Sequence, residues 1–228
     1  MSDLLHFSEH TLQEAAITFM AVVYIIRIRW LMRFTATKER QPPIGTGKVD
    51  PQKGSRYSLA NIAKPWAMES TRIHPFIYIQ FVIYHLGAAA AIGLSVIIPY
   101  SPGLLEYSAL TLFLQFFIGG AFIVGIVRLI RRVTNVYIRA ISSPDDYFAL
   151  ILLAVWFAFA YISIPNNTVN GEWHLLAFFM LTAFFLIYVP FSKISHYLYY
   201  PFARYYIGKS FGRRGVFPVK RGPARKTN

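Results

Sequence analysis

The chain has 228 residues, of which 55% are hydrophobic and 17% aromatic, and its formal net charge at pH 7 is +13. That hydrophobic share is typical of a membrane protein and argues against a soluble globular domain. Because the sequence contains no cysteine, disulfides, thiolate-bound iron–sulfur clusters and covalently attached c-type haem are excluded. Any redox centre must therefore be held by histidine, methionine or another non-thiol ligand.

The distribution of basic residues indicates how the chain crosses the membrane. All 23 lysines and arginines lie within residues 27–72, 128–139 and 193–226. Cytoplasmic loops are rich in Lys and Arg, so the blocks without them, 73–127 and 140–192, should each leave the cytoplasm and return. We predict an all-α, multi-pass bundle of five transmembrane helices in a prokaryotic cytoplasmic (inner) membrane, with the N-terminus outside and the C-terminus cytoplasmic. This sidedness argues against nucleic acid as a partner and favours the lipid bilayer itself or an acidic protein.

The first predicted span covers about residues 12–34. Its uncharged centre, Ala15–Ile26, is shorter than the roughly 20 residues that a span needs. We therefore expect Arg27 and the arginines that follow it to extend toward the inner headgroups. The next segment, residues 35–73, is rich in Pro and Gly, which predicts a loop that is non-helical for most of its length.

The remaining spans are bounded by proline and polar turns. The second begins at His74-Pro75, where proline suits a first helical turn. The fourth follows Ser142–Asp146, where carboxylates interact favourably with the helix dipole. Residues 1–200 would form the five-helix transmembrane domain and residues 201–228 a basic cytoplasmic tail. The later spans are predicted over about residues 74–99, 109–127, 146–164 and 173–196.

Four of the six histidines lie on just two predicted spans, the second and the fifth. His74 and His85 are about 20° apart around their helix, and His174 and His196 about 40° apart, so each pair shares a face. One member of each pair lies near the inner side and the other nearer the outside. Two antiparallel helices of this kind can hold two b-type haems by bis-imidazole ligation of the iron. His74 with His196 would hold the inner haem, and His85 with His174 the outer one.

The same histidines also allow interpretations without two haems. His74, near a helix end, could be an ordinary polar residue at headgroup level, whereas His85 within the hydrocarbon is costly and indicates function. Straight helices would separate His74 from His85 by about 16 Å but His174 from His196 by about 33 Å. Of the four proposed haem ligands, His174 therefore fits least well, and His10 is the candidate that could replace it. The alternatives are a single-haem cytochrome and a non-redox transporter or scaffold subunit.

Polar residues near the outer ends of the spans are candidates for a quinone pocket. They are chiefly Glu106 and Tyr107, with Tyr100 and Glu172 as further members, although each could be an ordinary residue of the outer aromatic and polar rim. No Ser/His/Asp arrangement, H-E-x-x-H motif or Gly-rich phosphate loop occurs, so no independent catalytic motif is evident. The inner docking surface for a soluble partner would consist of residues 35–73, 128–139 and 197–217.

The stretch Pro190–His196, which reads PFSKISH and is followed by Pro201, resembles the end of the fifth helix in the cytochrome b (gamma) subunit of respiratory nitrate reductase. It is also similar to the membrane cytochromes of heterodisulfide reductase and of Dsr-type complexes. The resemblance implies five helices and haem ligands on the second and fifth of them, with His74 and His196 matching the inner pair and His85 an outer ligand. His174 departs from this pattern, because the family's outer ligand on the fifth helix falls where this chain has Phe178.

The resemblance implies a dihaem cytochrome b anchor subunit of a respiratory complex. It would bind two haems b, with one as the alternative, and would use quinone or quinol as substrate. A cytoplasmic iron–sulfur subunit would be its electron-transfer partner. The lysine of the nitrate reductase quinol site has no counterpart here, so that contact is not implied. Electron transfer is reversible, and the sequence therefore sets neither its direction nor the quinone type.

Overall fold

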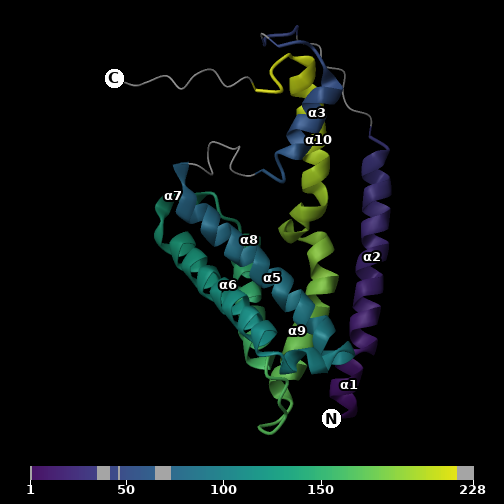
Figure 1. The fold of residues 1–228 in the computed structure, drawn as a ribbon, viewed down its shortest axis with the longest axis vertical. Coiled ribbons are helices and arrows are strands. Elements are labelled where there is room, and N and C mark those ends of the chain that lie inside the picture. Colours follow the sequence, from purple (N-terminus) through teal and green to yellow (C-terminus); the bar gives the residue numbers. More distant parts are fainter. Residues whose placement is uncertain (1, 35–41, 46, 65–72, 220–228) are drawn as a thin grey trace. The chain divides into compact units, whose positions relative to one another are not determined.

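The computed structural model describes residues 2–34, 42–45, 47–64 and 73–219. Within these ranges the protein consists of helices and turns and has no β-strand. The chain forms two compact units, each made of segments that are distant in sequence (Figure 1). Unit 1 comprises Met1–Arg27 and Phe76–Ile194, and unit 2 comprises Ile28–Pro75 and Ser195–Asn228.

The helices of unit 1 include most of the apolar sequence. Short 3₁₀ turns, labelled η, connect several of them. The elements are α1 (Asp3–Glu9), α2 (Thr11–Met32), α5 (Pro75–Tyr100), η2 (Pro102–Glu106), α6 (Ser108–Thr134), α7 (Val136–Ala140), α8 (Pro144–Ser163), α9 (Trp173–Tyr188), η3 (Val189–Phe191) and η4 (Lys193–Ser195).

Five helical segments are long and apolar enough to cross a membrane, which confirms the predicted number and approximate places of the spans. In the fifth, 44% of the apolar stretch is buried inside the protein, against 11% in the first. The fifth segment is therefore central to the packing, whereas the first leaves most of its apolar surface to its surroundings. The segments are Asp3–Met32, Pro75–Tyr100, Ser108–Thr134, Pro144–Ser163 and Trp173–Phe191.

Aromatic side chains from α8 and α9 form the centre of unit 1. Phe157 and Phe178 are fully buried, and the rings of Trp156 and Phe178 are stacked with centroids 6.3 Å apart. The indole Nε1 of Trp156 donates a hydrogen bond to Thr182 Oγ1 (2.8 Å), and this hydroxyl donates to the carbonyl of Phe178 (2.7 Å). The Trp156 indole N–H and the Thr182 hydroxyl are thus both satisfied internally, as burial requires.

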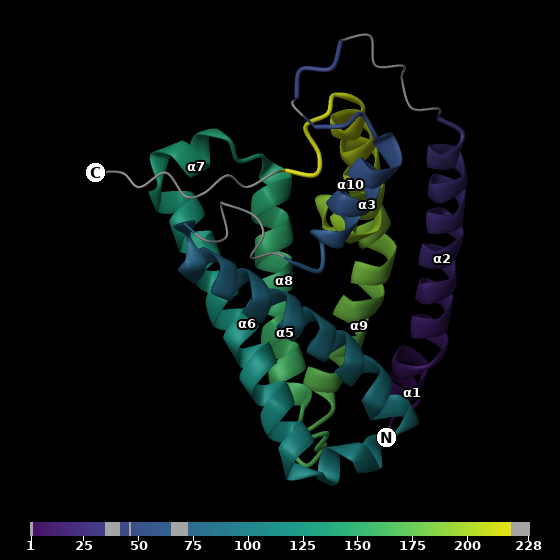
Figure 2. The ribbon, with the colours of Figure 1, turned by 45° about the horizontal axis from the view of Figure 1, so that its top comes forward.

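Helix α5 crosses α8 obliquely and approaches α6 closely (Figure 2). The ring of Tyr84 on α5 meets that of Phe157 on α8 edge to face, at 5.4 Å. A Cβ atom at Gly87 would collide with the Ala121 side chain and the Phe117 carbonyl of α6. Glycine is required there because a small residue lets the two backbones approach.

Helix α8 begins with a capping box, in agreement with the start predicted from Ser142–Asp146. The backbone N–H and the hydroxyl of Ser143 each donate to Asp146 Oδ2 at 2.8 Å. Lys193, at the end of the fifth span, donates to the other carboxylate oxygen at 3.0 Å and to the Ser143 hydroxyl at 2.8 Å. Arg132 of α6 lies 3.7 Å from the same carboxylate. Asp146 therefore links three helical segments.

Replacing Asp146 with asparagine is expected to lower the stability of unit 1. The amide is uncharged and has a single acceptor oxygen, so it cannot replace the carboxylate as the hydrogen-bond acceptor of both Ser143 and Lys193. Loss of such a cap costs about 1–2 kcal/mol. The melting temperature of the purified protein in detergent measures this loss. Glu106→Gln is the control, since Glu106 is an exposed carboxylate at the end of η2. Equal melting temperatures for the two variants would contradict the linking role of Asp146.

Unit 2 is built on α3 (Pro51–Ala60) and α10 (His196–Arg213), which lie side by side in both ribbon views (Figures 1 and 2). Residues 35–73 were expected to be non-helical for most of their length, and within them the structure contains the ten-residue helix α3. Asp50 caps this helix by accepting from the Lys53 N–H (2.9 Å), and Pro51 occupies its first turn. The segment expected to be a tail from residue 201 onward is helical as far as Arg213, because α10 gains a packing partner in α3.

Glycines form the contact between α3 and α10. A Cβ atom at Gly208 would lie 2.6 Å from both the Gly54 carbonyl oxygen and the Ser58 Cβ. One at Gly212 would lie 2.5 Å from the Asp50 carbonyl oxygen. Gly208 and Gly212 are four residues apart, the spacing at which small residues let two helices come into backbone contact. The loop and the C-terminal segment therefore fold on each other.

The irregular segment before α3 is held by backbone hydrogen bonds to the end of α10. The N–H groups of Gly45 and Gly47 donate to the carbonyls of Arg214 (2.9 Å) and Gly215 (3.0 Å). The N–H of Asp50 donates to the Gly212 carbonyl at 3.1 Å. These bonds supply partners that the non-helical backbone would otherwise lack.

Candidate functional site

His85 projects from the middle of α5, and its imidazole is exposed. Nδ1 lies 2.7 Å from the carbonyl oxygen of Phe81, one helical turn earlier, and the two rings are 4.0 Å apart. A carbonyl can only accept a hydrogen bond, so Nδ1 is the protonated donor in this contact, and in a neutral imidazole Nε2 then carries the lone pair. Metal-ligating histidines are commonly oriented in this way.

His174 is the second residue of α9 and is buried, with 8% of its surface exposed. Its ring lies 5.7 Å from that of Trp173, and its backbone carbonyl accepts from the buried Ser163 hydroxyl at 3.3 Å. The side chain therefore sits at the start of the fifth span, within the protein and not on its surface.

The structure places His85 and His174 at different depths on their helices. The C-terminal end of α5 and the start of α9 lie on the same side of unit 1 (Figure 1). His85 is about 22 Å along α5 from its last residue, Tyr100, whereas His174 is at the very start of α9. Helix α5 is inclined, which reduces this difference in depth. Pairing of these two histidines on one haem stays a prediction.

His74 and His196 both belong to unit 2 and are both exposed. His74 immediately precedes α5, and His196 is the first residue of α10. The shared face predicted for His174 and His196 requires a continuous helix, and that expectation is wrong. Helix α9 ends at Tyr188, and the extended backbone of Ser192 (φ −102°, ψ 169°) separates two 3₁₀ turns before α10. The angle and the 33 Å separation therefore do not apply, and the pairing of His74 with His196 stays a prediction.

The PFSK sequence anchors the end of the fifth span within unit 1. The guanidinium of Arg27 donates to the carbonyl of Pro190 and lies 5.0 Å from the centre of the Phe191 ring. Lys193 binds Asp146 at the start of α8. Arg27 was expected to extend to the lipid headgroups, but its charge instead contacts this motif.

A polar cluster at one end of unit 1 combines residues from the first and second spans. The Tyr100 hydroxyl donates to Glu14 Oε1 at 3.1 Å, and the Tyr100 ring meets that of His10 edge to face at 5.3 Å. The His10 ring in turn lies 4.7 Å from that of His6. Sequence reasoning missed this grouping, although the carboxylate of Glu14 directly before the apolar stretch Ala15–Ile26 was a signal for it.

The quinone-site candidates named from the sequence do not all join this cluster. Glu106 and Tyr107 are exposed at the end of η2, Tyr107 by 66%. The Glu172 carboxylate accepts hydrogen bonds from the Ser2 N–H (2.9 Å) and the Ser2 hydroxyl. These bonds lower the pKa of the Glu172 carboxyl, so it stays ionised to more acidic pH than usual and holds the N-terminal segment. Of the candidates, only Tyr100 belongs to the cluster with Glu14.

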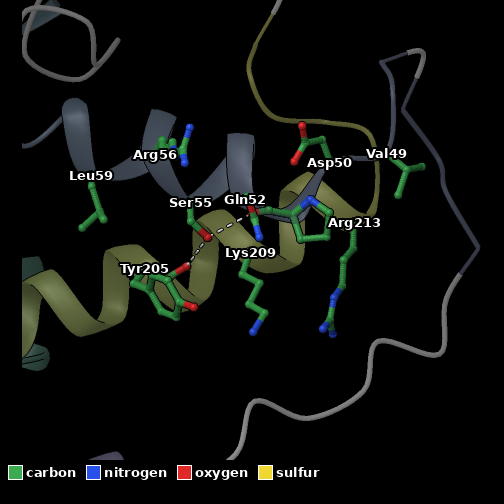
Figure 3. Close-up of a pocket in the computed structure, with 10 residues that line it drawn as sticks. Val49, Asp50, Gln52, Ser55, Arg56, Leu59, Tyr205, Lys209 and Arg213 are labelled. Atoms are coloured by element: carbon green, nitrogen blue, oxygen red, sulfur yellow. Dashed lines mark hydrogen bonds between the residues drawn. The ribbon is translucent and has the colours of Figure 1, made fainter.

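A groove of about 700 Å³ runs between α3 and α10 in unit 2 (Figure 3). Two of the three predicted docking segments, 35–73 and 197–217, supply its walls, whereas residues 128–139 belong to unit 1. The lining residues are Val49, Asp50, Pro51, Gln52, Ser55, Arg56, Leu59, Tyr205, Lys209 and Arg213.

The described part of the chain contains no group of three or more side chains that could hold a metal ion. Haem iron needs at most two axial ligands from the protein, and the histidines of α5, α9 and α10 can supply these singly.

These features define a class: an all-helical protein whose five longest apolar segments can each cross a membrane. The chain is 28% identical over 178 residues to a protein of Nitratidesulfovibrio vulgaris (strain Hildenborough). The aligned region covers 75% of this chain and 77% of the relative. The description of that relative is only "Protein" and names no activity. No family model and no solved structure matches the chain.

Proposed function

We propose that this chain is a dihaem cytochrome b membrane-anchor subunit of a respiratory complex. It would pass electrons between the membrane quinone pool and a cytoplasmic iron–sulfur subunit, with its N-terminus outside and its C-terminus inside. The observation that carries the proposal is His85, which lies on an apolar span with Nδ1 bonded to a backbone carbonyl, the orientation that is common among metal-ligating histidines.

The residues suit b-type haem because the chain offers imidazoles and no thiolate. His85 and His174 would hold the haem nearer the outside, and His74 and His196 the one nearer the cytoplasm. Haem b, when bound, accepts and donates one electron at a time. The carbonyl of Phe81 orients the imidazole of His85.

The cluster of Tyr100, Glu14 and His10 is suited to exchange protons with a quinol. Oxidation of a quinol releases protons, and Glu14 Oε1 is an acceptor that already binds the Tyr100 hydroxyl. Glu106 and Tyr107 stay candidates for the rim of the same pocket. The cluster is the stronger candidate, because its members contact one another across two spans.

Glu14→Gln is expected to slow quinol-dependent haem reduction by about 100-fold, the usual contribution of a positioned general base. The amide cannot take up a proton, although it can still accept the Tyr100 hydrogen bond. Stopped-flow absorption with a water-soluble quinol measures the rate, and dithionite reduction of the same sample verifies that its haem is intact. Glu106→Gln is the matched carboxylate control. A larger loss in the control than in Glu14→Gln would move the pocket to η2.

The proposed function predicts a reduced-minus-oxidised spectrum of b-type haem in the purified protein. Pyridine haemochrome analysis should count about two haems per chain. A colourless, folded preparation from cells supplied with haem would reject the cytochrome and favour a non-redox transporter or scaffold subunit.

A single-haem anchor is the second candidate. It is favoured by the interruption between α9 and α10 and by the position of His174 at the start of α9, which both depart from a simple two-haem arrangement. A count of one haem per chain would select it.

A further inference from the structure

We propose that the groove between α3 and α10 binds the phosphate of an anionic phospholipid through Lys209 and Arg213. The proposal does not depend on haem or on electron transfer. It rests on three features of unit 2, which are the uncompensated charge of the groove, the tyrosines of α10 and the apolar part of the groove walls.

The positive charge of the groove is not balanced by the residues that the structure describes. Among them, no ion pair involves Arg56, Lys209 or Arg213. The carboxylate nearest to them in sequence, Asp50, accepts the N–H of Lys53 as the cap of α3. Figure 3 shows this carboxylate directed away from the ends of the basic side chains of α10.

Lys209 and Arg213 present their charges together. They are four residues apart on α10, and both line the groove. Figure 3 shows the two side chains leaving the helix in the same direction, with the Tyr205 ring on the same face. The Lys209 ammonium lies 5.7 Å from the centre of that ring. Like charges at this spacing repel each other, and a phosphate between them would relieve the repulsion while accepting hydrogen bonds from the Arg213 guanidinium.

Unit 2 also contains the residues that follow the first apolar span. The Tyr206 hydroxyl of α10 donates to the backbone carbonyl of Phe34 (3.4 Å), two residues beyond the end of that span at Met32. The helix that carries Lys209 and Arg213 is therefore joined to the chain directly after a span.

The composition of α10 and of the groove favours a lipid. Tyrosine is enriched where membrane meets water, and α10 carries Tyr197, Tyr199, Tyr200, Tyr205 and Tyr206. Val49, Pro51 and Leu59 add apolar surface to the groove, which a glycerol backbone and the start of an acyl chain can cover. An acidic peptide would use the cations but has no need of this apolar wall.

The test compares lipids on the full-length protein purified in detergent. Added phosphatidylglycerol should raise the melting temperature more than added phosphatidylcholine does. In the double variant Lys209→Gln/Arg213→Gln, the phosphatidylglycerol concentration for half the effect should rise about 30-fold, as expected from roughly 1 kcal/mol for each cation near an anionic surface. Lys48→Gln/Lys53→Gln is the control. It removes the same charge from unit 2 but from residues outside the groove, and it should bind as the wild type does.

The other outcomes each overturn the proposal. Equal responses of the two double variants would mean that bulk charge, not the groove, attracts lipid. Stabilisation by inorganic phosphate to the same extent would assign the site to a free anion. Stabilisation by a polyglutamate peptide and not by phosphatidylglycerol would assign it to an acidic protein. Lys209→Arg/Arg213→Lys should retain lipid binding, and its failure to do so despite a normal melting temperature would likewise contradict the proposal.

Discussion

His85→Ala is expected to remove one of two b-type haem signals and to leave the other. The imidazole lies on an apolar span with Nδ1 held by the Phe81 carbonyl, and no neighbouring histidine on α5 can replace it. Pyridine haemochrome analysis should fall from about two haems per chain to about one. A redox titration should show the loss of one potential. His6→Ala is the control, because His6 is an exposed residue of α1.

The partner of His85 is identified by the same measurement. If His174 is the second axial ligand, His174→Ala should remove the same signal as His85→Ala. If His10 takes this role, His10→Ala should do so and His174→Ala should not. Loss of neither signal in His85→Ala would mean that His85 is not a ligand. Loss of both, in a protein that still melts cooperatively, would mean that the second haem binds only when the first is present.

Alanine is expected to have opposite effects at two helical glycines. At Gly208 the new Cβ would lie 2.6 Å from the Gly54 carbonyl oxygen, and since this atom is backbone, α3 and α10 must separate. Such overpacking costs about 1–3 kcal/mol. At Gly93 on α5, no atom lies within 4 Å of the new Cβ. The removal of glycine flexibility should therefore stabilise the protein by about 0.5–1 kcal/mol.

Limited proteolysis and hydrogen exchange report on the two glycine variants locally. Gly208→Ala should expose α3 to cleavage and speed exchange of its amides while leaving the five apolar spans unchanged. In Gly93→Ala, both units should be protected from cleavage and from hydrogen exchange as well as they are in the wild type. If Gly208→Ala left the protection of α3 intact, the glycine contact would not be what holds unit 2 together.

The five spans and the start of α8 could be predicted from the sequence, because each rests on information within one segment. A run of apolar residues is long enough to cross a membrane or it is not, and a capping box needs only Ser143 and Asp146, three residues apart. The predicted sidedness is equally local, because it follows from the confinement of Lys and Arg to three segments. The candidate histidines were also found in this way, since a polar residue in an apolar run is visible without a partner.

Which distant residues meet could be learned from the folded chain alone. Helix α3 has a local start signal in Asp50 and Pro51, but its packing of Gly54 and Ser55 against Gly208 is not visible within residues 35–73. The Tyr100–Glu14 contact joins residues 86 positions apart, and the hydrogen bond from Arg27 to Pro190 likewise joins distant parts of unit 1. Helix propensity is a weak local preference that packing overrides. A prediction from one segment therefore fails wherever the deciding contact comes from another.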